Sequence, residues 1–141
     1  MSEGVRGLII AHSSLAAGLV AAVRQISGVD EEALRPLSNE GYGPEGLLEA
    51  VNGALGDPET PVVIFTDLPS GSCAFTARKI SLSRPNTGLV CGVNLAILLD
   101  FVFHRNLPLP QLVERLVEKG RAGVTGACRE DPAHADRAVS R

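Results

Sequence analysis

The chain has 141 residues, 45% of them apolar and only 4% aromatic, which fits one domain with an aliphatic core. Its net charge of -3 provides no basic surface for nucleic acid. No apolar run approaches the roughly 20 residues that span a bilayer. The first residues lack a charged segment followed by an apolar one, so we expect no signal peptide. The three cysteines (Cys73, Cys91 and Cys128) are scattered and odd in number, which favours reduced thiols in a cytoplasmic protein.

Short apolar runs alternate with amphipathic stretches along the chain, in an order typical of α/β proteins. The apolar runs predict strands at residues 5–11, 33–37, 61–66 and 89–93, and Pro36 places the second of these at a sheet edge. The intervening stretches predict helices at residues 15–26, 44–55, 72–82, 95–103 and 111–120. Leu15, Val20 and Ile26 belong to the expected apolar face of the first helix, and Ser13 is its expected N-cap.

This order predicts a doubly wound α/β fold, in which a mostly parallel sheet of four strands carries helices on both faces. A short additional strand is expected around Val124. Residues 1–128 would form the domain, and the polar, aperiodic residues 129–141 are expected to be a disordered tail.

Polar residues follow three of the predicted strands. His12 ends the first strand, Asp67 ends the third and Asn94 follows the fourth, so the three should meet at one edge of the sheet. If the first and third strands are neighbours, Asp67 can accept a hydrogen bond from one ring nitrogen of His12 and leave the other as a nucleophile. The backbone N–H groups of Gly71, Ser72 and Cys73, at the start of a helix, could then bind an anion such as a phosphoryl group.

Each of these residues also has an ordinary structural interpretation. His12 could be a loop residue, and Asp67 could cap the helix that follows it. Ser70 and Ser72 could serve only as turn or capping residues. Cys73 could be a small buried hydrophobe, although a helix N-terminus would lower its pKa.

Four segments, in order, carry a family resemblance: GLIIAH at residues 7–12, FTDLPSGS at 65–72, CGVN at 91–94 and GRAGV at 120–124. Together they resemble the IIA component of the mannose-family (mannose/fructose/sorbose) sugar phosphotransferase system. In that family the histidine at the end of the first strand takes a phosphoryl group from the phosphorylated carrier protein HPr. It passes the group to a IIB component that serves a membrane sugar permease.

The resemblance implies a catalytic pair of His12 and Asp67, with Ser72 in the loop that contacts phosphate. It also implies a homodimer in which a C-terminal strand, here residues 123–127, crosses to the sheet of the partner. The chain departs from the family at Ser13, where glycine is common, and in the loop from Ser70 to Cys73, where the family has paired glycines, serine and proline.

Other functions are consistent with the same residues. The chain could be a regulatory module that is phosphorylated without serving transport, or a phosphotransferase subunit of the dihydroxyacetone-kinase type, which its His-Ser-Ser start also resembles. A small hydrolase using Ser72 is a further alternative, although it lacks a Gly-x-Ser-x-Gly elbow. No His or Cys pair has metal-ligand spacing and no Gly-x-Gly-x-x-Gly motif follows the first strand, so we expect neither a metal nor another cofactor.

Overall fold

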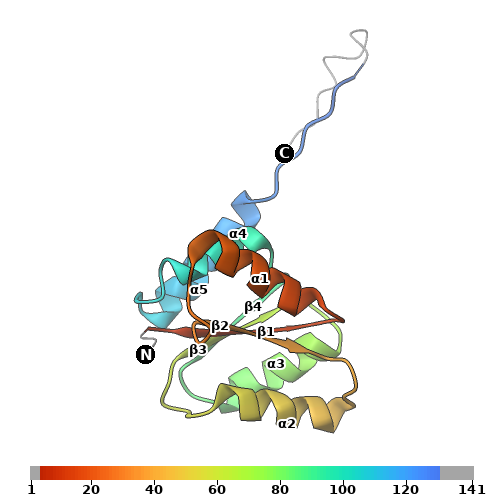
Figure 1. Cartoon of the computed structure of the whole chain (residues 1–141), viewed down its shortest axis with the longest axis vertical. Coiled ribbons are helices and arrows are strands. Elements are labelled where there is room, and N and C mark those ends of the chain that lie inside the picture. Colours follow the sequence, from red (N-terminus) through yellow and green to blue (C-terminus); the bar gives the residue numbers. More distant parts are fainter. Residues whose placement is uncertain (1–3, 131–141) are drawn as a thin grey trace.

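The computed structural model describes residues 4–130, which form a four-stranded sheet flanked by helices (Figure 1). In chain order the elements are β1 (Arg6–Ala11), α1 (Leu15–Ser27), β2 (Leu34–Ser38), α2 (Pro44–Leu55), β3 (Val62–Thr66), α3 (Ser72–Ser83), β4 (Thr87–Cys91), α4 (Leu95–Val102) and α5 (Leu109–Ala122). The predicted α/β fold with four parallel strands is confirmed.

The strands lie in the order β2-β1-β3-β4, and every neighbouring pair is parallel. The chain first runs from β1 outward to β2, and then returns past β1 to reach β3 and β4. Strand order therefore reverses between β1 and β3. In open α/β sheets, ligands bind at the carboxyl ends of the strands beside such a reversal. Here His12 and Asp67 follow those two strands.

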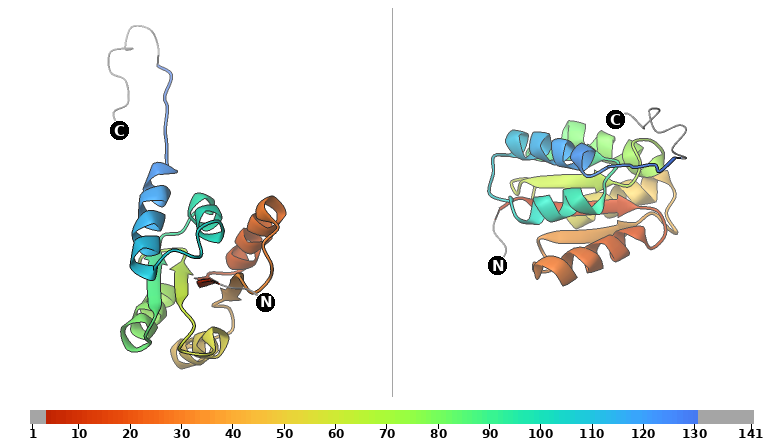
Figure 2. Two further views of the ribbon diagram at one scale, coloured as in Figure 1. Left: turned by 90° about the vertical axis from the view of Figure 1, so that its left-hand side faces the viewer. Right: turned by 90° about the horizontal axis from the view of Figure 1, so that it is seen from above.

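Helices cover both faces of the sheet, with α1, α4 and α5 on one face and α2 and α3 on the other (Figures 1 and 2). Successive strand residues point to opposite faces and so supply two halves of the core. Ile9 and Phe65 belong to the half under α1, α4 and α5, whereas Leu8 and Ile64 belong to the half under α2 and α3. All residues of the central strand β3 are buried, as expected for a parallel strand with helices on both sides.

Phe101 of α4 is the largest anchor between that helix and the sheet. Its ring is fully buried and meets Phe65 edge-on, with centroids 5.2 Å apart. We expect Phe101→Ala to lower the free energy of unfolding by about 3–5 kcal/mol, because it removes this contact and leaves a cavity. Urea denaturation measures the change. The control Leu82→Ala, at a position 89% exposed, should change it by less than about 0.5 kcal/mol; equal losses in the two variants would contradict the prediction.

The start of α1 differs from the prediction. The N-cap is Ser14, whereas Ser13 has a φ of +55°, a left-handed conformation that is costly for a residue with a side chain. The buried face of the helix is formed by Ala16, Val20 and Val23. Leu15 and Ile26 are about half exposed, because each lies to one side of this buried face.

β4 begins two residues earlier than predicted and ends at Cys91. Residues 84–88 contain proline and glycine and therefore resembled a turn, but Thr87 and Gly88 already pair with Val62 and Val63 of β3. Gly88 is needed because α5 packs closely on the strand there: a Cβ would come within 2.6 Å of Val113 Cγ2.

The short strand expected around Val124 does not form within the single chain. Residues 124–130 carry no regular structure, and they extend away from the sheet and helices (Figure 1). Most of the predicted tail, residues 131–141, lies outside the described residues. Within residues 4–130, no helix combines the length and the apolar character needed to cross a bilayer.

Candidate functional site

His12 and Asp67 meet at the carboxyl ends of β1 and β3. The two strands are direct neighbours, with Ile10 of β1 opposite Thr66 of β3. The residues that follow the strands are therefore brought side by side, although they are 55 positions apart in the sequence. His12 Nδ1 and Asp67 Oδ2 are separated by 2.8 Å. The convergence predicted for these two residues is thus present in the structure.

The Asp67 carboxylate is held by three hydrogen bonds. Its Oδ2 accepts the backbone N–H of His12 at 3.0 Å in addition to the ring contact, and its Oδ1 accepts the backbone N–H of Leu68 at 3.0 Å. Burial by itself raises the pKa of this carboxyl, but the side-chain and backbone hydrogen bonds from His12 outweigh it, so the pKa lies below its ordinary value of 3.8. Asp67 is therefore ionised at neutral pH.

An ionised carboxylate only accepts hydrogen bonds, so the proton of a neutral His12 ring must sit on Nδ1. The lone pair of the ring is then on Nε2. The His12 side chain is 46% exposed, whereas that of Asp67 is 10% exposed. The arrangement presents an oriented nitrogen nucleophile to solvent, with a fixed negative charge behind it.

The start of α3 lies beside this pair. Gly71 is its N-cap and has a φ of +98°, a conformation that glycine adopts without strain. The Phe75 N–H donates to the Gly71 carbonyl at 2.9 Å, so the N–H groups of Ser72, Cys73 and Ala74 have no acceptor within the helix. No side chain caps this end. These free donors and the helix dipole favour an anion, and a phosphate role for Gly71, Ser72 and Cys73 stays a prediction.

Cys73 is closer to the pair than the sequence indicated. Its Sγ, a ring nitrogen of His12 and a carboxylate oxygen of Asp67 all lie within 4.8 Å of one another. The expected lowering of its pKa is wrong. Burial of the thiol, followed by the charge of Asp67, raises the pKa of Cys73 above its ordinary value, and a hydrogen bond with the Ser72 side chain only partly opposes this. The thiol is 1% exposed and protonated at neutral pH.

Two contacts that sequence reasoning missed hold the loop between β3 and α3. The fully buried Thr66 donates its hydroxyl to the Leu68 carbonyl at 2.8 Å, and Arg78 donates to the Pro69 carbonyl at 2.7 Å. A threonine that ends an apolar strand directly before Asp67 was a usable signal for the first contact. Arg78 lies two turns into α3, and nothing in its local sequence indicates its role.

Asn94 lies at the same edge of the sheet, but its side chain binds the backbone of α4 and α5. Its Oδ1 accepts the Ile97 N–H at 2.9 Å and so caps α4, while its Nδ2 donates to the Gly120 carbonyl of α5 at 3.2 Å. Both polar atoms of the side chain are thus directed at the two helices, and the expectation that Asn94 joins His12 and Asp67 is not met.

We expect Asn94→Ala to lower the free energy of unfolding by about 1–2 kcal/mol, because both hydrogen bonds are lost. Asn94→Asp keeps the acceptor for α4 and loses only the bond to Gly120, so it should lose about half as much. Chemical denaturation of the two variants and the wild type tests this. Equal decreases in the free energy of unfolding of the two variants would show that the hydrogen bond from Ile97 to Asn94 does not stabilise the protein.

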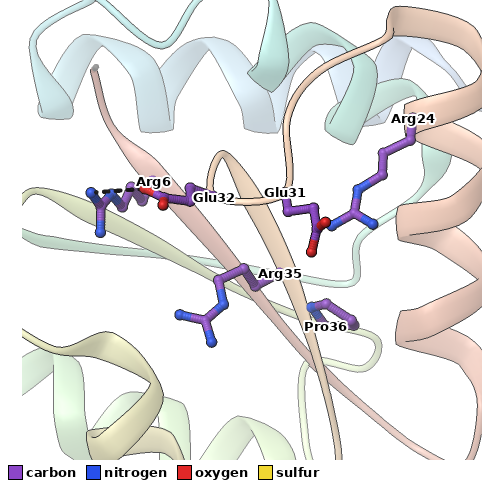
Figure 3. Close-up of a pocket in the computed structure, with 6 residues that line it drawn as sticks. All are labelled: Arg6, Arg24, Glu31, Glu32, Arg35 and Pro36. Carbon is purple, nitrogen blue, oxygen red and sulfur yellow. Dashed lines mark hydrogen bonds and ion pairs between the residues drawn. The ribbon is translucent and has the colours of Figure 1, made fainter. Parts of the chain in front are cut away.

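Two other features were considered as sites. His104 Nδ1 lies 2.8 Å from the Asp100 carbonyl at the end of α4, and the Asp100 carboxylate is bound by Arg115, so this histidine belongs to a helix-to-helix contact. A cavity of about 590 Å³ lies at the amino ends of β1 and β2 (Figure 3). Its lining combines three arginines, two glutamates and a proline (Arg6, Arg24, Arg35, Glu31, Glu32 and Pro36). It holds no nucleophile and lies at the opposite end of the sheet from His12.

Comparison with known proteins identifies one protein family. The family model described as PTS system fructose IIA component, EIIA-man, matches residues 7–117. No significant match was found among curated proteins.

Several solved structures share the fold. The phosphotransferase system component EIIA of Streptococcus agalactiae is 19% identical, with a TM-score of 0.79 over 86% of this chain and 96% of that one. The mannose/sorbose-specific IIA subunit of Enterococcus faecalis is also 19% identical, with a TM-score of 0.79 over 92% of this chain and 98% of that one. A sigma-54 interaction domain protein from Enterococcus faecalis is 12% identical and has a TM-score of 0.70 over 86% and 94% of the two chains.

Proposed function

Because the chain belongs to the EIIA-man family of fructose IIA components of the sugar phosphotransferase system, we propose that His12 is its phosphoryl carrier. In this proposal His12 accepts a phosphoryl group from phosphorylated HPr and passes it to a separate IIB component, which serves a membrane sugar permease. The observation that carries the proposal is the 2.8 Å contact between His12 Nδ1 and Asp67 Oδ2, with the ring half exposed.

The chemistry follows from this contact. The Nε2 lone pair of His12 attacks phosphorus, an N–P bond forms, and the N–P bond to the histidine of HPr breaks with its electron pair returning to that ring. The Nδ1 proton stays on His12 and continues to donate to Asp67. The attacked ring gains positive charge as the bond forms, and the ionised Asp67 stabilises it. The free N–H groups at the start of α3 suit the negative charge on the three phosphoryl oxygens.

Exposed apolar side chains near His12 suit protein partners rather than a small substrate. Leu15, Tyr42, Leu68 and Phe75 lie in segments that follow or adjoin the carboxyl ends of the strands, and each is between 46% and 63% exposed. Apolar and aromatic side chains of this kind provide binding energy when two proteins dock. Docked there, a partner would bring its own histidine to His12.

The open edge of β4 supports a homodimer. β4 ends the sheet, and a groove of about 300 Å³ beside it is lined in part by the apolar residues Val90, Ile97, Val117 and Val124. Residues 123–127 of a second copy could add to this edge as a strand, and Val124 is 74% exposed in the single chain. We expect the chain to be a dimer in the cytoplasm, where HPr and the IIB component would be its partners.

The hydrolase alternative gains no support. A serine hydrolase needs its nucleophile hydrogen-bonded to the base, and Ser72 makes no hydrogen bond to His12 within the described part of the chain.

The test is transfer in a purified system that contains labelled phosphoenolpyruvate, the first enzyme of the phosphotransferase system and HPr. We expect about one acid-labile, base-stable label per chain, dependent on HPr. Addition of a IIB component should then remove the label from the chain. No labelling by charged HPr would overturn the proposal, and labelling that no IIB component removes would overturn the transport role and leave the regulatory one.

A further inference from the structure

His12 and Asp67 have a third neighbour, the Cys73 side chain, whose thiol takes no part in the proposed phosphoryl transfer. Cys73 Sγ, a His12 ring nitrogen and an Asp67 carboxylate oxygen lie within 4.8 Å of one another, and they offer three different ligand types. Cys73 approaches from the protein interior, whereas His12 faces solvent. We propose that the unphosphorylated protein binds Zn²⁺ through His12, Asp67 and Cys73, and that the bound metal blocks the phosphorylation of His12.

The donor set suits this ion. Zn²⁺ is bound by thiolate, imidazole and carboxylate, at bond lengths that place neighbouring ligand atoms of a tetrahedral site about 3.3–3.6 Å apart. His12 Nδ1 and Asp67 Oδ2 are 2.8 Å apart, so they would separate by about 0.5 Å if both bound the ion. Bringing the remaining atoms from within 4.8 Å into the coordination sphere requires shifts of at most about 1.5 Å. Hard ions such as Mg²⁺ prefer oxygen ligands, so the thiol selects against them.

Zinc and the phosphoryl group exclude each other whichever ring nitrogen holds the metal. If zinc binds Nε2, it takes the nucleophilic lone pair directly. If it binds Nδ1, it replaces the proton that now lies between Nδ1 and Asp67, and the proton of the neutral ring moves to Nε2, which then has no lone pair. In both cases the Cys73 thiol releases its proton to solvent on binding the metal, and the ring keeps one proton.

The competition is reciprocal. Once Nε2 carries the phosphoryl group, its lone pair is used in the N–P bond, and zinc could reach Nδ1 only by displacing the proton that Nδ1 donates to Asp67. A ligand that binds only the unphosphorylated form shifts the population toward that form by the ratio of its affinities. Free zinc would therefore hold the carrier in its uncharged state.

The first test uses Co²⁺ as a spectroscopic substitute for Zn²⁺ on the purified, unphosphorylated full-length chain. Thiolate ligation produces a charge-transfer band in the near ultraviolet, so we expect this band in the wild type and its loss in Cys73→Ser and in His12→Ala. A matched control, Cys91→Ser combined with Cys128→Ser, removes the other two thiols and should keep the band. No band in the wild type, or an unchanged band in Cys73→Ser, would overturn the proposal.

The second test measures Zn²⁺ affinity by competition with a chromophoric chelator. We expect Cys73→Ala to weaken zinc binding by more than about tenfold, since even the loss of an outer partner of a ligand costs that much. Circular dichroism of the variant shows whether the fold is kept. Neither metal measurement requires phosphorylation, so zinc binding can fail or succeed separately from the proposed carrier role.

The third test joins the two activities. Labelling of the wild type by charged HPr is measured with and without Zn²⁺, and the ratio of the two rates is compared with the same ratio for Cys73→Ser. We expect zinc to suppress labelling strongly in the wild type and much less in the variant. As a control, phosphorylation of HPr itself is measured at the same zinc concentration and must be unchanged. Equal suppression in the two proteins would overturn the claim that metal at Cys73 blocks His12.

Discussion

His12→Ala is expected to reduce labelling by phosphorylated HPr to background while leaving the fold intact. The substitution removes the only nucleophilic nitrogen that Asp67 orients. Among the described residues the other histidine, His104, lies at the end of α4 next to Arg105, whose carbonyl accepts the Val5 N–H, so it stands at the amino end of β1, away from Asp67. Because the His12 side chain is 46% exposed, its loss leaves no cavity in the core. Phosphate labelling and urea denaturation of the same preparation separate the two effects.

The matched control for this experiment is His104→Ala, which removes the second described histidine from a structural position. We expect it to keep full labelling stoichiometry and to lose some stability, because His104 contacts both the backbone and the carboxylate of Asp100. Continued labelling of folded His12→Ala would mean that another residue carries the phosphoryl group. In that case the contact between His12 and Asp67 would have a purely structural purpose.

Most of the fold could be predicted from the sequence because the two central strands, β1 and β3, are short apolar runs between polar turns. β3 is the clearest case, since all of its residues are buried and all are apolar except Thr66. Pro36 correctly placed β2 at an edge. The meeting of His12 with Asp67 followed from a topological rule, because neighbouring parallel strands end at the same edge of a sheet. No local pattern connects these two residues.

What the sequence could not predict depends on contacts between distant segments. Thr87 and Gly88 belong to β4 because they pair with β3, although their local composition resembles a turn. Ser13 adopts a left-handed conformation, where the requirement of the loop overrides the preference of the residue. The spacing of His and Cys residues along the chain indicates no metal site, because the three side chains proposed to bind zinc (His12, Asp67 and Cys73) come together from two strand ends and a helix start.

Asp67→Asn should slow phosphorylation of His12 by about a hundredfold or more, because the charge that stabilises the attacked ring is lost. Asparagine keeps the size of the side chain and an oxygen that can still accept hydrogen bonds. Its amide can also turn its NH₂ group toward Nδ1, which would draw the proton of the ring to Nε2 and remove the lone pair. The rate of labelling is measured at saturating phosphorylated HPr, and the label per chain is measured at long times. A variant that reaches full labelling slowly is then distinguished from one that is never phosphorylated.

A pH series measures what the ionised Asp67 contributes to stability, and the labelling rate measures separately what it contributes to phosphorylation of His12. Because the pKa of Asp67 is lowered in the folded protein, its ionised form contributes stability that is fully present above the ordinary value of 3.8 and is lost as the pH falls through the lowered pKa. The stability gap between the wild type and Asp67→Asn should therefore be constant near neutral pH and close in acid. Asp57→Asn, which removes one carboxylate from the turn before β3, at the opposite end of that strand from Asp67, should leave the labelling rate unchanged. If Asp67→Asn phosphorylates at the wild-type rate near neutral pH, the carboxylate does not act through the ring, and His12 needs no partner to accept the phosphoryl group.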